Sequence, residues 1–235
     1  MRLLRVGRIS ALNMYPIYHG LERAEDPTLR FTDGVPTALN AALLDGRLDV
    51  SAVSSIAFAR NAARLRLVPV ASITADGAVD SIQVFSRVPF AEVRRVAVTP
   101  HSATSVALLR VLLGADAPPF TLLDRPPAEA LEDVDGVLLI GDEALGGLRE
   151  PFAPHRTDLG ELWRARTGRP MAFAVWAASE EAARERPAAL AELAALLTRA
   201  RSAYLADPEA VVRAAAERFP FPADFIRPYL RRLRY

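Results

Sequence analysis

The sequence of 235 residues contains no cysteine and no lysine, so that all 29 basic residues are arginine. Without cysteine the chain offers no thiol nucleophile, disulfide, iron–sulfur cluster or thiolate zinc site. Without lysine it can form no Schiff base with a carbonyl compound, and it has no P-loop lysine. Its three histidines, His19, His101 and His155, show no HExxH-like spacing. We therefore expect no metal site and no cofactor.

Long apolar runs and an excess of charge of one sign are also absent. No stretch reaches the roughly 18 to 20 uncharged apolar residues that a membrane span needs. Arg5 and Arg8 interrupt the segment in which a secretory signal needs an unbroken apolar run, so we expect a cytoplasmic location. The net charge of +1 does not favour a nucleic-acid surface. Hydrophobic residues make up 51% of the chain and charged residues 24%, as in a globular protein of one large domain or two lobes.

Short apolar runs alternate with amphipathic segments along the first half of the chain, a pattern that predicts βα units around a parallel sheet. Strands are expected at residues 3–9, 48–53, 67–73, 81–86, 93–99, 136–140 and 171–177. Helices are expected at residues 16–21, 35–44, 56–63, 106–113, 128–131, 141–147 and 158–167, and from residue 179 onward with a break at Pro187. Ser54 and Ser55 are expected to cap the third of these helices, and Gly146-Gly147 to end the helix that begins at Gly141.

The chain has no linker, repeat or change of composition that separates tandem domains. We therefore predict an α/β protein with two discontinuous lobes, one formed by residues 1–83 and 174–235 and the other by residues 84–173. Two crossing strands would act as a hinge, and the central cleft would be the ligand site.

Polar residues gather at three expected strand-to-helix junctions, residues 9–13, 53–55 and 99–105. Helix N-termini at such junctions present unpaired N–H groups, which together with hydroxyls can hold a carboxylate without lysine. Helix capping alone is the alternative at each junction. Similarly, Gly141-Asp142-Glu143 is either part of the site or an acidic first turn, and His101 is either an acid–base residue or a surface histidine. The residues alone thus indicate a cleft protein for a small anionic ligand.

Several motifs in their order along the chain resemble the menaquinone-biosynthesis chorismate dehydratase family of the futalosine pathway. These motifs are Arg8–Pro16, Gly34–Asn40, Leu48–Ser55, Asp76–Ile82, Ser102–Leu109, Ile140–Leu145 and Asp158–Trp176. The resemblance implies a periplasmic-binding-protein type II fold. It also implies a lyase that removes water from chorismate, a small dicarboxylate, to give 3-[(1-carboxyvinyl)oxy]benzoate. Met14 stands where these relatives usually carry threonine.

The resemblance also implies roles for individual residues. Asn13 and Ser81 match polar site residues of the family. Asn13 would bind the substrate and stabilise developing charge, and Ser81 would touch the leaving hydroxyl or a carboxylate. A bend-forming strand residue is the alternative for Ser81. The residues expected to bind the substrate carboxylates are Ser54, Ser55, Ser102, Thr104 and Ser105.

Two rival interpretations stay open. One is a non-catalytic solute-binding protein that holds an aromatic or dicarboxylic ligand in the same cleft. The other is the sister enzyme of the same pathway, which acts on a nucleoside-type substrate. Its opening motif normally carries an aspartate after Pro-Asn, which the segment from Ser10 to Pro16 lacks.

Overall fold

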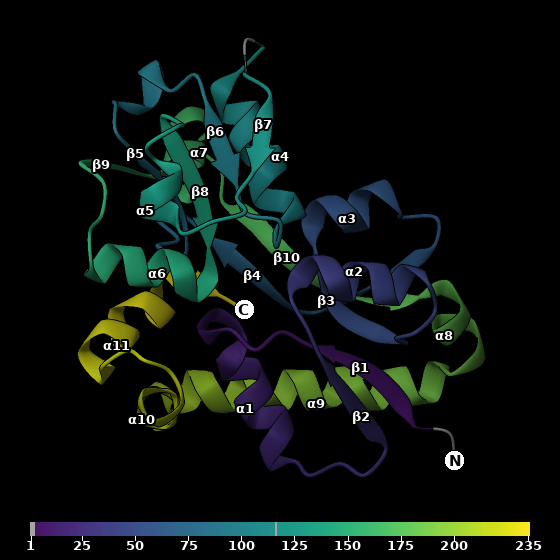
Figure 1. Ribbon diagram of the computed structural model, residues 1–235. Helices are drawn as coiled ribbons and strands as arrows, with labels where there is room; N and C mark the ends of the chain where they lie inside the picture. The colour runs from purple at the N-terminus through teal and green to yellow at the C-terminus, as the bar shows by residue number, and fades with distance from the viewer. Residues whose placement is uncertain (1–2, 116) are drawn as a thin grey trace. The chain divides into compact units, whose positions relative to one another are not determined.

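A computed structural model describes residues 3–115 and 117–235 (Figure 1). The chain divides into two compact units: Met1–Thr74 with Ala172–Tyr235, and Ala75–Met171. The predicted lobes, residues 1–83 with 174–235 and residues 84–173, stay a prediction.

The first unit is built on a mixed six-stranded sheet of order β11-β4-β10-β3-β1-β2. The strand bounds are β1 Leu4–Arg8, β2 Leu29–Asp33, β3 Val50–Ser54, β4 Leu65–Ala75, β10 Met171–Ser179 and β11 Leu233–Arg234. β1 is parallel to both β2 and β3, whereas β10 is antiparallel to β3. Because β1 lies between β2 and β3, the chain leaves β1 toward one side and returns to the other.

Helices cover both faces of this sheet because parallel crossovers are right-handed. The connection through α1 (Tyr15–Arg23) leads from β1 to β2, and the connection through α2 (Pro36–Leu44) leads back past β1 to β3. The two connections run in opposite directions, which puts the two helices on opposite faces of the sheet. The long helix α9 (Pro187–Ala206) packs on α1, where a Cβ on Gly20 would lie 2.5 Å from that of Ala200 (Figure 1). The other helical segments are η1 Leu12–Met14, α3 Ser55–Arg60, α8 Glu180–Glu185, α10 Pro208–Arg218 and α11 Ala223–Arg232.

The second unit repeats this plan with a five-stranded sheet of order β7-β6-β8-β5-β9. The strands are β5 Ile82–Ser86, β6 Val96–Val98, β7 Phe120–Leu122, β8 Gly136–Ile140 and β9 His155–Asp158. β6 is parallel to β7 and β8, and β5 is antiparallel to β8 and β9. The helical segments are η2 Phe90–Glu92, α4 Ala103–Leu113, α5 Pro127–Ala130, α6 Gly141–Arg149 and α7 Leu159–Thr167. Phe85, Val137 and Leu139 belong to the buried core of the unit.

Three details of the sequence prediction are wrong. The sheets are mixed rather than parallel, because β10 and β5 run against their neighbours. α6 does not end at Gly146-Gly147 but continues to Arg149. Gly147 instead allows α6 to pack closely on Phe85, because a Cβ on Gly147 would lie only 2.7 Å from the Phe85 ring. The Ser54 side chain makes no capping bond to α3, because it binds Asn40 instead. Among the described residues, no helix has the length and hydropathy of a membrane span.

Candidate functional site

The polar junctions lie at the topological switch point of each sheet, where ligands bind in open α/β proteins. In the first unit the switch point falls between β1 and β3, which lie side by side and send the chain to opposite sides. Segment 9–13 follows the carboxyl end of β1, and Ser54 and Ser55 mark the end of β3. The parallel pairing of β1 with β3 therefore puts these predicted residues at one edge of the sheet.

The second unit has an equivalent switch point between β6 and β8. The segment 99–105 follows β6, and Gly141 begins α6 directly after β8. Ser81 joins them because β5 is antiparallel to β8, with Ile82 opposite Ile140, and the Gly141 amide donates to the Ser81 carbonyl at 2.8 Å. The remaining predicted residues thus meet at a single edge of the second sheet.

Asn13 lies in η1, and its Oδ1 is buried without a hydrogen-bond partner among the described residues. A buried polar atom without a partner costs free energy of folding unless a ligand or a water molecule forms a hydrogen bond with it. The loop before it is fixed by Tyr18, whose hydroxyl donates to the Gly7 carbonyl at 3.0 Å and accepts from the Ile9 amide at 3.4 Å. Burial raises the pKa of the Tyr18 phenol, which therefore stays neutral. Asn13 thus has a rigid support and an unfilled acceptor.

Ser54 is buried and bound on both sides by Asn40. The Asn40 Nδ2 donates to the Ser54 Oγ at 2.9 Å, and the Ser54 amide donates to the Asn40 Oδ1 at 3.2 Å. Because a hydroxyl is one donor and two acceptors, Ser54 keeps its proton for another partner. Ser55 is the first residue of α3 and is partly exposed. Asn40 therefore holds Ser54 in place. This role was not predicted from the sequence, although Asn40 lies within a family motif.

Two of the predicted hydroxyls of the second unit, those of Ser102 and Ser105, bind each other. Ser102 is the N-cap of α4: its Oγ accepts from the Ser105 amide at 3.1 Å and donates to the Ser105 Oγ at 2.8 Å. The capping alternative therefore accounts for the Ser102 side chain. Thr104 and Ser105 are buried in the first turn of the helix.

Ser81 is 1% exposed, and its Oγ donates to the Val79 carbonyl at 3.4 Å. This bond is longer than the 2.5 to 3.0 Å typical of a hydroxyl donor, so it uses little of the hydroxyl's capacity. β5, which begins directly after Ser81, carries Gln83, which is 2% exposed and whose Oε1 has no partner among the described residues. Sequence reasoning missed Gln83, although an amide inside an otherwise apolar strand was a usable signal.

An open hollow of about 360 Å³ lies at the carboxyl ends of β6 and β7, and its lining includes Thr99, His101, Arg125 and Glu143. Glu143 as a residue is exposed, but desolvation of its carboxyl raises its pKa, an effect that the nearby His101 opposes. His101 and Glu143 thus line one hollow beside the switch point. Among the described residues, no cluster of three or more histidine and acidic side chains could hold a metal ion.

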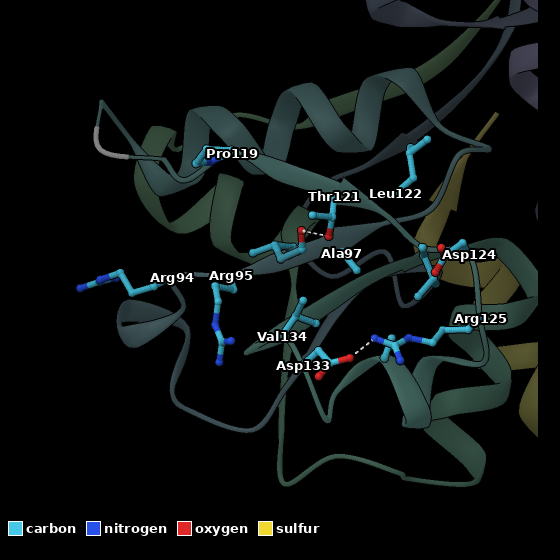
Figure 2. Close-up of a pocket in the computed structure, with 13 residues that line it drawn as sticks. Arg94, Arg95, Ala97, Pro119, Thr121, Leu122, Asp124, Arg125, Asp133 and Val134 are labelled. Carbon is cyan, nitrogen blue, oxygen red and sulfur yellow. Dashed lines mark hydrogen bonds and ion pairs between the residues drawn. The ribbon is translucent and has the colours of Figure 1, made fainter.

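A second hollow of about 540 Å³ in the same unit has a less promising lining (Figure 2). Its three arginines already donate to protein oxygens. Arg125 pairs with Asp133, as the dashed line in Figure 2 shows, Arg95 pairs with Asp135, and Arg94 donates to two backbone carbonyls. These cations are therefore engaged within the protein, which makes this hollow a weaker candidate than the switch point.

Known proteins resemble this chain in sequence and in fold. Against a curated chorismate dehydratase from Thermus thermophilus, the chain is 36% identical over 251 residues, covering all of this chain and 90% of the relative. A crystal structure of a protein from Archaeoglobus fulgidus matches with a TM-score of 0.77 at 14% identity, over 99% of this chain and 88% of that one. The periplasmic aliphatic sulphonate binding protein of Escherichia coli matches with a TM-score of 0.67 at 18% identity, over 99% and 84%.

A third structure, from Candida albicans, is described as having the generic periplasmic binding protein fold. It matches with a TM-score of 0.73 at 10% identity, over 99% of this chain and 81% of that one. These likenesses confirm the predicted fold class. The family model for menaquinone biosynthesis matches residues 4–235. Together with the full-length relative, this match shows that the chain belongs to the menaquinone biosynthesis family.

Proposed function

We propose that this protein is a chorismate dehydratase, a lyase that removes water from chorismate to give 3-[(1-carboxyvinyl)oxy]benzoate in the futalosine route to menaquinone. The observation that carries the proposal is its 36% identity, along its whole length, to a curated enzyme of that name. The polar switch points of both units support it, because each gathers hydroxyls and helix N-termini suited to carboxylates. A cytoplasmic location remains a prediction.

The chemistry suits a site made of neutral polar groups. Loss of the ring hydroxyl and of the adjacent proton makes the ring aromatic, so the reaction is strongly favoured. The protein then has to position the substrate, exclude water, and assist departure of the proton and the hydroxide. A carboxylate of the substrate can itself serve as the base.

The residue roles are part of the proposal. Asn13 has a side-chain amide whose N–H group can donate to the substrate and stabilise developing negative charge. Ser81 would touch the leaving hydroxyl or a carboxylate, and its long bond to Val79 leaves it available. The residues proposed to hold the carboxylates are Ser54, Ser55, Ser102, Thr104 and Ser105. Of these, Ser102 would act mainly by holding the start of α4.

Incubation with chorismate tests the proposal. We expect a benzoate absorbance and a product lighter by one water in the mass spectrum. Asn13→Ala and Ser81→Ala should lower kcat/KM by roughly ten- to a thousandfold, as for loss of a transition-state hydrogen bond. Asn61→Ala and Ser86→Ala are matched controls, since their polar groups bind local carbonyls, and they should turn over normally. A folded protein without turnover would refute the enzymatic proposal.

The rival proposal, a non-catalytic solute-binding protein, has support from one of the structural relatives, which is a periplasmic binding protein for sulphonates. The same experiment separates the two. Binding of chorismate without conversion would favour the solute-binding protein.

A further inference from the structure

The carboxylate of Asp158 gathers an unusual number of donors around the segment that carries Ser81. Its oxygens accept from the amides of Val79 and Asp80 at 2.7 to 3.1 Å. They also accept from the Gly160 and Glu161 amides at 2.9 and 3.0 Å, where Asp158 caps α7. One carboxylate thus joins the start of α7 to the residues before β5.

The fifth donor to Asp158 is the side chain of Gln83. Its Nε2 donates to Asp158 Oδ2 at 2.7 Å and to the Asp80 carbonyl at 3.1 Å. Both partners are acceptors only, so a flipped amide would put oxygen against oxygen, and the orientation is fixed. The Gln83 Oε1 is therefore the atom left buried and without a partner among the described residues.

Such an acceptor selects a ligand that can donate. An unfilled buried acceptor costs free energy, and a site built to bind an O–H discriminates against ligands that lack it. At neutral pH both carboxyls of chorismate are ionised and accept only, so its ring hydroxyl is its single O–H donor. The dehydrated product has no hydroxyl at all.

We infer that Gln83 is a specificity-determining residue whose Oε1 accepts a hydrogen bond from the ring hydroxyl of the substrate, and that Asp158 is the residue that positions it. The inference rests on the proposed dehydratase function. Ser81 lies at the bend that immediately precedes β5, two residues before Gln83. Ser81 would then offer a donor to the oxygen of the hydroxyl whose proton Gln83 accepts.

Gln83→Leu tests the inference, because it removes the acceptor at nearly constant size. We expect the KM and the dissociation constant for chorismate to rise about tenfold, as for one neutral hydrogen bond. The inhibition constant of the product should change less than threefold, because the product has no hydroxyl for Gln83 to bind. Product binding also shows that the site of the variant is intact. Ser86→Ala, at a buried residue of the same strand, should leave both constants unchanged.

Asp158→Asn tests the positioning role and serves as the second variant if Gln83→Leu fails to fold. Asparagine has one acceptor in place of two, so the amide of Gln83 loses its fixed orientation. We expect chorismate binding to weaken more than product binding, which a purely structural defect would not produce. Asp135→Asn is the matched control: Asp135 also accepts from two backbone amides, those of Arg94 and Arg95.

The outcomes separate this inference from the proposed function. If the wild type turns over chorismate and both Gln83→Leu and Asp158→Asn weaken substrate and product equally, or neither, the inference is overturned. Oε1 then faces only water. If the wild type binds neither compound, the proposed function itself fails and the assignment of Gln83 to chorismate falls with it. A selective loss of chorismate binding supports both.

Discussion

Replacing Gly160 by alanine should loosen the segment that carries Ser81. A Cβ built on Gly160 lies 2.6 Å from the backbone carbonyl oxygen of Gly77 and 3.2 Å from Asp158 Oδ1. The oxygen belongs to the backbone of the Asp76-Gly77 turn, so relief requires a shift of the turn or of α7. Overpacking of this kind costs about 1 to 3 kcal/mol. Alanine returns at most about 1 kcal/mol through helix propensity. The free energy of unfolding should therefore fall by about 1 to 2 kcal/mol.

Gly146→Ala provides the matched control for this prediction. Gly146 lies in α6 of the same unit, and a Cβ there would meet nothing within 4 Å. The same substitution should thus raise the free energy of unfolding by about 0.5 to 1 kcal/mol. Urea titration followed by circular dichroism measures both variants against the wild type. If Gly160→Ala is as stable as Gly146→Ala, the close approach of α7 to the turn is not present in the protein.

The remaining predictions concern two carboxylates and their pH dependence. Asp49 is buried and accepts from Arg5 and Arg186, so Asp49→Ala should lower the free energy of unfolding by about 3 kcal/mol in urea titrations. Burial would raise the pKa of Asp49, but hydrogen bonds from Arg5 outweigh this and lower it. Its stabilisation is therefore complete above its ordinary value of 3.8 and is lost as the pH falls through the folded pKa; a wild-type curve flat below pH 4 would contradict this. The pKa of Glu143 is raised by desolvation, so stability should fall as the pH rises past its ordinary value of 4.5. Glu143→Gln should remove that part of the pH dependence, and an unchanged curve would contradict it.

The sequence predicted the central strands of both sheets and missed their edges. β2 and β11 are the edge strands of the first sheet, and β7 and β9 those of the second. Edge strands are partly exposed, so they lack the apolar runs by which central strands are recognised. β9, for example, is His-Arg-Thr-Asp and has no buried residue, whereas the five residues of β5 are all buried.

Candidate site residues that lie in short local motifs were predicted from the sequence. Those that depend on contacts between distant parts of the chain were not. Hydroxyl-rich junctions are visible in the sequence because they follow apolar strands directly. The bond between Asp158 and Gln83 joins residues 75 positions apart. The amide of Asn40 reaches Ser54 across 14 positions. Local pattern contains no information on such pairs, which only the sheet topology brings together.

A titration followed by NMR tests most directly whether the proposed site residues at the switch point of each sheet contact the ligand. Labelled protein is titrated with 3-[(1-carboxyvinyl)oxy]benzoate, and the amide resonances are followed. We predict shifts in residues 10–13 and 54–55 of the first unit and residues 81–83, 101–105 and 141–143 of the second. Shifts confined to other surfaces, such as the hollow of about 430 Å³ lined by Gly20, Leu196 and Val211, would contradict it.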